Sequence, residues 1–93
     1  FSKEELYGLT SQIRRSSLSI ASNIAEGCGR NSDAELARFL VIAMGSAAEA
    51  EYQLLLAKDL GYIEDLIYKK LDDELNQIRK MLNAFIKKVN ARK

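Results

Sequence analysis

The sequence predicts an all-α protein, an up-down antiparallel helical bundle that forms a single domain over residues 1–93. One observation is the absence of proline, a residue that costs about 3 kcal/mol in the interior of a helix. Another is that the five glycines leave long stretches unbroken, and a third is that apolar residues recur along these stretches at helical spacing. Short connections make consecutive helices antiparallel neighbours. We expect helices over about 4–26, 33–60 and 64–90.

The first expected helix has an apolar face and many small side chains. The apolar face consists of Leu6, Leu9, Ile13, Ile20 and Ile24. The serines and alanines between them would let a neighbouring helix approach closely, and no histidine is present to activate a serine. Thr10, just after Gly8, could cap a second start within this segment.

The second expected helix is bounded by recognisable signals. Ser32 and Glu35 form a capping box, in which Ser32 accepts a hydrogen bond from the third helical N–H and Glu35 reaches back. Gly61 suits the left-handed position that follows the last turn. The third expected helix is opened by Asp65 and has a seam close to a heptad repeat. The seam consists of Tyr68, Leu71, Leu75, Ile78, Leu82, Phe85 and Val89.

The second helix is also apolar nearly all the way round, from Leu36 to Ala57. A helix of that kind must be buried on all sides, which three helices of one small chain do not easily achieve. Either a fourth helix is missing, or a partner subunit covers this helix, or both. The residues that we expect at an oligomer interface are Phe39, Ile42, Ala43, Ser46 and Ala50.

The composition argues against an enzyme. With no histidine and a single cysteine, Cys28, the chain lacks Ser–His and Cys–His dyads, zinc sites that need imidazole, and the Glu-x-x-His motif of di-iron bundles. Glu49 and Glu51 point to different helix faces, so they form no acid/base couple, and scattered acids make no metal cage. We expect no cofactor and no metal.

Composition also bears on location. A lone cysteine suits a reducing cytoplasm, where we expect the protein. No uninterrupted apolar run approaches the roughly 20 residues that a bilayer requires, so we expect no membrane partner.

The net charge is only +1, but it is unevenly distributed. Residues 79–93 contain bases and no acid, whereas residues 49–74 are rich in acids. Antiparallel packing would bring Arg30 and Arg38 beside this basic tail. Such charge can simply complement helix dipoles in a solvated tail, or it can neutralise phosphates with little sequence specificity. The candidate nucleic-acid contacts are Arg14, Arg15, Arg30, Arg38, Lys87, Lys88, Arg92 and Lys93.

The adjacent Arg14 and Arg15 lie about 100° apart on a helix, so they cannot both face the core. We expect one of them to pair with Glu49 or Glu51 of the second helix. A structural ion pair is favoured here over a ligand site.

Several segments resemble a known family. They are Gly8–Ser17, Ser19–Gly27, Arg38–Leu40, Gly45–Ser46 and Glu49–Ala57. Together they resemble the bacterial four-helix-bundle family associated with intervening sequences of 23S rRNA genes, to which the accessory variability protein of diversity-generating retroelements is similar. The resemblance covers essentially the whole chain.

The resemblance implies an up-down four-helix bundle that assembles into a barrel-like homopentamer. The family has a further helix ahead of the segment with which this chain starts, so we expect the first helix to be missing and its groove to be open to another chain. For the retroelement branch, binding to a reverse transcriptase and to nucleic acid is also implied. Arg14 and Arg15 match the family's Arg-Arg pair, and Asn23, Glu26 and Gly27 match its helix-end motif, with structural or interfacial roles.

We therefore expect a non-enzymatic, oligomeric helical-bundle protein. It would act as a scaffold or adaptor whose basic surface binds nucleic acid or a reverse transcriptase weakly. The alternative is a purely self-associating structural protein with no nucleic-acid role.

Overall fold

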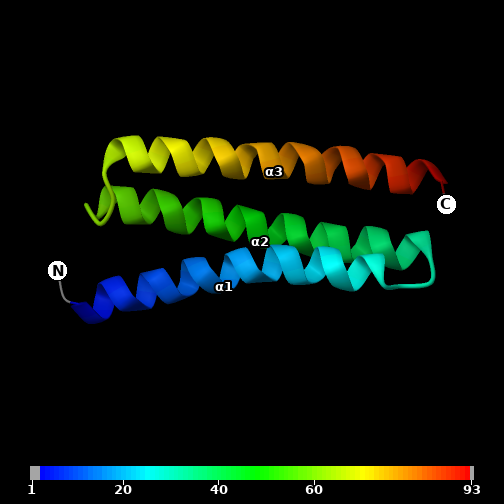
Figure 1. Ribbon diagram of the computed structural model, residues 1–93, viewed down its shortest axis with the longest axis horizontal. Coiled ribbons are helices and arrows are strands. Elements are labelled where there is room, and N and C mark those ends of the chain that lie inside the picture. Colours follow the sequence, from blue (N-terminus) through cyan, green and yellow to red (C-terminus); the bar gives the residue numbers. More distant parts are fainter. Residues whose placement is uncertain (1–2, 93) are drawn as a thin grey trace.

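The computed structural model describes residues 3–92, and these form three helices and no strand. They are α1 (Lys3–Cys28), α2 (Asp33–Asp59) and α3 (Asp65–Arg92). α1 and α3 run in one direction and α2 in the other, so the start of α1 lies at the same end as the α2–α3 connection (Figure 1). The predicted all-α, antiparallel arrangement is confirmed, and each helix begins and ends within two residues of its expected position.

α1 is one continuous helix, and the expected second start at Thr10 is wrong. The Thr10 hydroxyl donates a hydrogen bond to the Leu6 carbonyl at 2.8 Å, one turn earlier in the same helix. Ser17 does the same with the Ile13 carbonyl at 2.9 Å. A hydroxyl that bonds back into its own helix does not cap a new one, so these residues lie on a helix surface.

Gly27 explains how closely α1 and α2 approach each other. A Cβ at this position would lie 2.9 Å from Phe39 Cβ and 3.1 Å from Leu36 Cδ1. Carbon atoms in good contact are about 3.5–4.0 Å apart, so a larger residue would push the two helices away from each other. The chain then turns through residues 29–32 into α2.

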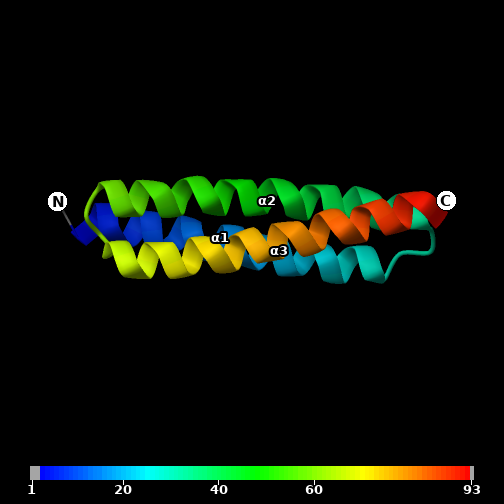
Figure 2. The same ribbon diagram turned by 90° about the horizontal axis from the view of Figure 1, so that it is seen from above.

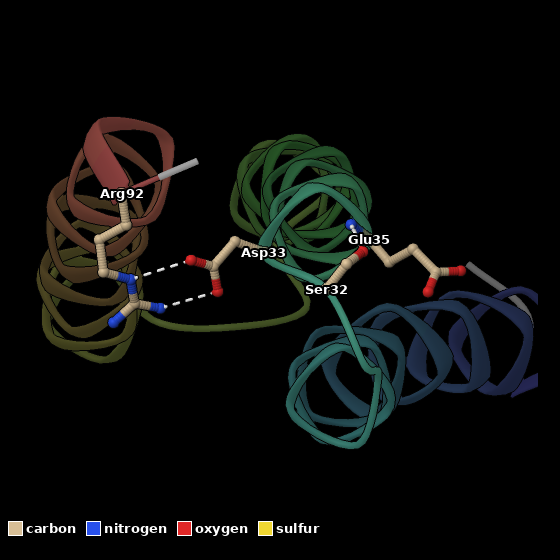
Figure 3. A network of polar contacts seen from close by, with 4 residues as sticks. All are labelled: Ser32, Asp33, Glu35 and Arg92. Carbon is tan, nitrogen blue, oxygen red and sulfur yellow. Dashed lines mark hydrogen bonds and ion pairs between the residues drawn. The ribbon is translucent and has the colours of Figure 1, made fainter.

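Ser32 caps α2 as predicted. The Glu35 N–H donates to Ser32 Oγ at 3.2 Å (Figure 3). The reciprocal half of the expected capping box is not formed, because the Glu35 carboxylate points away from Ser32 (Figure 3). Asp33 and Glu35 still place negative charge in the first turn, where it favours the positive end of the helix dipole.

Gly61 ends α2 with a φ of 77°, in the left-handed region that glycine tolerates. The Gly61 N–H donates to the Lys58 carbonyl at 3.0 Å, and the Tyr62 N–H donates to the Ala57 carbonyl at 2.8 Å. This is the Schellman pattern, which satisfies the last carbonyls of a helix. The predicted role of Gly61 is therefore confirmed.

α2 is the central helix. Over residues 3–92, α1 and α3 each pack against α2 and not against each other. Figure 1 shows α2 between α1 and α3, and in the view turned by 90° both α1 and α3 are displaced to one side of α2 (Figure 2). The fully buried core residues are Leu40, Ala43 and Ala47 of α2 and Val89 of α3. The arrangement is thus two helices laid against one.

The seam of α3 is buried in part. Leu75, Leu82 and Val89, each seven residues after the last, are buried against α2. Leu71, on the same predicted seam, remains 37% exposed. The heptad repeat therefore identifies the right face of α3, but α2 alone does not cover all of it.

α2 is the one helix within residues 3–92 that is long and apolar enough to cross a membrane by length and composition, with a mean hydropathy of 1.3 in its most apolar stretch. A central helix flanked by two others has the same composition, because apolar residues are needed on more than one of its faces. Only 33% of that stretch is buried, so contact with α1 and α3 accounts for part of this composition.

Candidate functional site

A polar patch lies in the crevice between α1 and α2. It encloses about 450 Å³ and is lined by Gln12, Arg15, Ser16, Ser19, Ser46, Glu49 and Gln53. The buried Ser16 donates a hydrogen bond to Gln53 Oε1 at 2.8 Å. The Ser19 and Ser46 hydroxyls lie 2.7 Å apart and share a hydrogen bond. The floor of the polar patch is therefore satisfied within the chain and fixes α1 against α2.

The helix-end residues singled out by the resemblance make contacts within the chain. Asn23 Nδ2 donates to the Ser19 carbonyl at 2.8 Å and to Ser19 Oγ at 3.1 Å, which extends the polar patch by one turn. Glu26 forms an ion pair with Arg30 at 2.7 Å, and Gly27, which has no side chain, lets α2 approach α1 closely. These contacts are structural.

The expected ion pair between α1 and α2 is not formed. Glu51 pairs instead with Arg79 of α3, with Nη1 and Oε2 2.6 Å apart. Glu51 and Glu49 are two residues apart, about 200° round the helix, so Glu51 faces α3 while Glu49 lines the polar patch. Arg15 lines the same patch, yet within residues 3–92 neither Arg15, Arg14 nor Glu49 has an ion pair.

The end of α3 lies beside the start of α2, as the antiparallel prediction requires. Arg92 Nε and Nη2 each lie 3.2 Å from a carboxylate oxygen of Asp33, in a two-pronged contact (Figure 3). Because Arg30 is also paired, with Glu26, two of the predicted nucleic-acid contacts at this end are partly neutralised.

The remaining candidates do not form one surface. Arg38, Lys87 and Lys88 are exposed at the same end and have no ion pair within the described residues. We call the end formed by Arg30, Arg38, Lys87, Lys88 and Arg92 the basic end. Lys93 lies outside the described residues. Arg14 and Arg15 stand in the middle of α1, about 20 Å along the helix from Arg30.

An aromatic contact that the sequence reasoning missed organises the basic end. The Arg30 guanidinium carbon lies 4.9 Å from the centre of the Phe39 ring, and that of Arg38 lies 5.7 Å from it. Both distances are within the range of cation–π attraction. Phe39 therefore holds two guanidinium groups near each other.

An apolar groove runs between α1 and α3, where these helices do not touch. It encloses about 440 Å³ and is lined by Ser17, Ile20, Ala21, Ile24, Leu75, Ile78, Met81, Leu82 and Phe85. Met81 is 63% exposed at its edge. An open apolar surface of this length is typical of a site for another helix.

A second apolar surface lies on the outer face of α2. We call it the outer seam; it consists of Val41, Gly45, Ala48, Tyr52 and Leu55. Val41 is 57% exposed and Tyr52 66%. The steps of four and three residues between its members are those of a heptad seam.

The residues expected at an oligomer interface lie mostly inside the chain. Ala43 and Ala50 are buried in the core, and Ser46 is hydrogen-bonded to Ser19. Phe39 packs at the turn against α1, and only Ile42 is exposed, at 41%. The expectation failed because, in a helix that is apolar all round, composition does not indicate which face packs against the chain's own helices.

The features found among the described residues are surfaces on which another molecule can pack. Within residues 3–92, no three His, Cys, Asp or Glu side chains are grouped so as to hold a metal ion, and Cys28 is exposed and free. These features define the class of protein: a small antiparallel helical protein whose surface carries the polar patch, the apolar groove, the outer seam and the basic end.

The sequence profile of the 23S rRNA-intervening sequence protein family matches residues 1–84, and the chain belongs to this family. Among solved structures, a protein of unknown function of the S23 ribosomal protein family from Bacteroides thetaiotaomicron is similar, with a TM-score of 0.82 and 35% identity over 85% of this chain and 73% of that one. No protein of curated function matches significantly. The resemblance drawn from the sequence is confirmed.

Proposed function

We propose that this protein is a non-enzymatic, self-associating helical scaffold of the cytoplasm that binds nucleic-acid backbones weakly through its basic end. The observation that carries the proposal is the outer seam, an apolar helix face that nothing in residues 3–92 covers. An apolar face of this kind is stable in water when another helix covers it. A second copy of the chain can supply that cover by heptad packing.

Gly45 supports contact with a copy at the outer seam. A Cβ at this position would meet no atom within 4 Å, so the chain's own packing does not require glycine here. In a helix interior, glycine costs about 1 kcal/mol relative to alanine. A partner helix that passes close to Gly45 gives a reason for this residue. The family resemblance suggests a homopentamer as the size of the assembly.

Light scattering tests self-association directly. We expect the unmodified chain to have a mass several times its 10.4 kDa. Tyr52→Glu and Val41→Glu should give smaller species, because each buries a charge in the outer seam. Leu66→Glu is the matched control, since Leu66 is 81% exposed at the start of α3 and lies off the seam. A monomeric unmodified chain would refute the proposal.

We assign the apolar groove to a fourth helix that completes the bundle. The groove has an almost wholly apolar lining, and the match covers 73% of the Bacteroides thetaiotaomicron chain, which leaves part of that chain outside the matched region. An environment-sensitive apolar dye should bind the 93-residue chain, and Met81→Lys should weaken that binding. If the gene encodes a further helix ahead of residue 1, a chain extended by that helix should lose dye binding. Equal binding by the extended chain would remove the fourth helix from the proposal.

Binding to nucleic acid is supported by the basic end. Arg38, Lys87 and Lys88 are exposed there without acidic partners in the described chain, and an assembly would present several copies of them. The logarithm of the association constant for an RNA or DNA oligonucleotide should fall linearly with the logarithm of salt concentration. Changing Arg38 and Lys88 to Gln should make that slope shallower. The same change at Lys69 and Lys70, near the opposite end, is the control.

A second candidate is a purely self-associating structural protein. The pairing of Arg30 with Glu26 and of Arg92 with Asp33 favours it, because these contacts reduce the charge left for phosphates. Self-association without salt-dependent binding would establish this alternative. A reverse transcriptase remains our proposed protein partner if the gene lies beside one, and co-purification of the two proteins would test it.

A further inference from the structure

The rim of the polar patch differs from its floor. On the floor, Ser16 donates to the Gln53 carbonyl oxygen, and the Ser19 and Ser46 hydroxyls share a hydrogen bond. On the rim, Arg15 of α1 and Glu49 of α2 are both exposed, and neither has an ion pair or a side-chain hydrogen bond within residues 3–92. The patch therefore presents one free cation and one free anion.

This arrangement narrows the possible occupant. A floor whose hydroxyl groups are already hydrogen-bonded within the chain leaves fewer groups for a small polar ligand to bind. A rim with one charge of each sign does not favour an anion or a cation alone. It suits neighbours that supply the opposite charges, and in a ring of identical chains one neighbour can offer a Glu49 to Arg15 while the other offers an Arg15 to Glu49.

We infer that Arg15 and Glu49 form ion pairs between copies of this chain, Arg15 of each copy with Glu49 of another. The inference rests on the proposed self-association and names the residues that set its register. Glu49 follows Ala48 of the outer seam and lies one turn from Gly45 and from Tyr52. In heptad packing, charges at such flanking positions select the partner and fix its alignment, while the apolar seam supplies most of the affinity.

Charge reversal tests the pairing. Arg15→Glu or Glu49→Arg alone places like charges opposite each other, and each should raise the concentration needed for half-assembly by about tenfold or more. The double variant Arg15→Glu/Glu49→Arg restores opposite charges and should assemble within about threefold of the unmodified chain. An equimolar mixture of the two single variants should assemble better than either variant alone, because unlike neighbours restore opposite charges at their contact.

The controls separate pairing from net charge and from folding. Lys80→Glu and Asp73→Arg make the same charge changes at exposed positions of α3 and should leave assembly unchanged. Circular dichroism should show unchanged helicity for the single variants; if either unfolds, Arg15→Gln and Glu49→Gln replace them, and each should weaken assembly and reduce its dependence on salt.

The outcomes also distinguish this inference from the proposed function. Single variants that assemble like the unmodified chain, or a double variant that stays dissociated, would overturn the Arg15–Glu49 pairing. If Tyr52→Glu still dissociates the assembly in that case, self-association through the outer seam stands. If Tyr52→Glu also has no effect, the outer seam fails as well.

Discussion

The two interfaces that α2 makes with its neighbours are built from different side chains. Against α1, contact depends on small and polar residues, with Gly27 admitting Phe39 and the Ser19 and Ser46 hydroxyls joined at 2.7 Å. Against α3, it depends on larger apolar residues such as Leu82 and Val89. Close approach and hydrogen bonds specify the first interface, whereas hydrophobic burial dominates the second.

This difference predicts how each interface responds to substitution. A seam of large side chains loses stability when atoms are removed, because a cavity forms. An interface of small side chains loses stability when atoms are added, because there is no room for them. All free energies of unfolding below refer to denaturant titrations at one fixed chain concentration, since self-association would add to stability.

The largest effect is expected at the α2–α3 interface. Leu82 is 4% exposed and belongs to the core cluster, so Leu82→Ala should lower the free energy of unfolding by about 2–5 kcal/mol. Leu66→Ala, the same change at an 81% exposed position of α3, should cost less than about 0.5 kcal/mol. A loss at Leu82 no larger than at Leu66 would show that α3 is not held by its seam.

At the α1–α2 interface, adding a single methyl group should be harmful. In Gly27→Ala, the higher helix propensity of alanine is opposed by a Cβ placed 2.9 Å from Phe39 Cβ, an atom that cannot move without the α2 backbone. We expect a net loss of about 1–2 kcal/mol in the free energy of unfolding.

Gly45→Ala is the matched control, because space around Gly45 is open. It should stabilise the dissociated chain by about 1 kcal/mol while weakening self-association at the outer seam. A stabilising Gly27→Ala would contradict the close approach of α1 and α2, and an unchanged assembly in Gly45→Ala would argue against a partner helix there.

The fold could be predicted from the sequence because the residues that begin and end its helices act through local contacts. Ser32 marks the start of α2 through one hydrogen bond to a nearby N–H, and Gly61 marks its end through a backbone conformation. The prediction for Thr10 was wrong because a threonine hydroxyl can either cap a helix or donate to a carbonyl four residues back. The residue type is the same in both cases, so the sequence does not distinguish them. Helix boundaries therefore follow from the sequence better than the roles of single hydroxyls.

The site was less predictable because it depends on which face of each helix is turned toward which neighbour. Glu51 forms an ion pair with Arg79 of α3 and not with α1, and the apolar Ala43 and Ala50 are buried in the core. The spacing of small residues in α2 was a usable signal for the face that packs against the serine-rich helix α1. Ser46 is one of these small residues. Ser16, the partner of Gln53, lies 37 residues away, and Arg30 reaches Phe39 only across the turn between α1 and α2, so no local pattern identifies these two contacts.

A smaller effect is expected from the hydroxyl pair of the α1–α2 interface. Ser19→Ala and Ser46→Ala should each lower the free energy of unfolding by about 1 kcal/mol, since each leaves the other hydroxyl without this partner. The double variant should cost less than the sum of the two. Ser17→Ala, an exposed hydroxyl bonded only within α1, should change stability by less than about 0.5 kcal/mol. Additive losses would mean that the two hydroxyls act independently.

The smallest effect concerns Tyr62, which ties the α2–α3 connection to the start of α1 by donating a hydrogen bond to Glu5 Oε2 at 3.4 Å. Partial removal from water, and then the negative charge of Glu5, raise the pKa of Tyr62 above its ordinary value of 10.0. Above that pH, the folded chain keeps a phenol proton that the unfolded chain has lost, so this group contributes a loss of stability as pH rises. Glu5→Gln should lower the pKa of Tyr62, measured as the component of phenolate absorbance that Tyr62→Phe removes. An unmoved component would mean that Glu5 does not act on Tyr62, and that the polar character of the α1–α2 side does not extend to this end of the bundle.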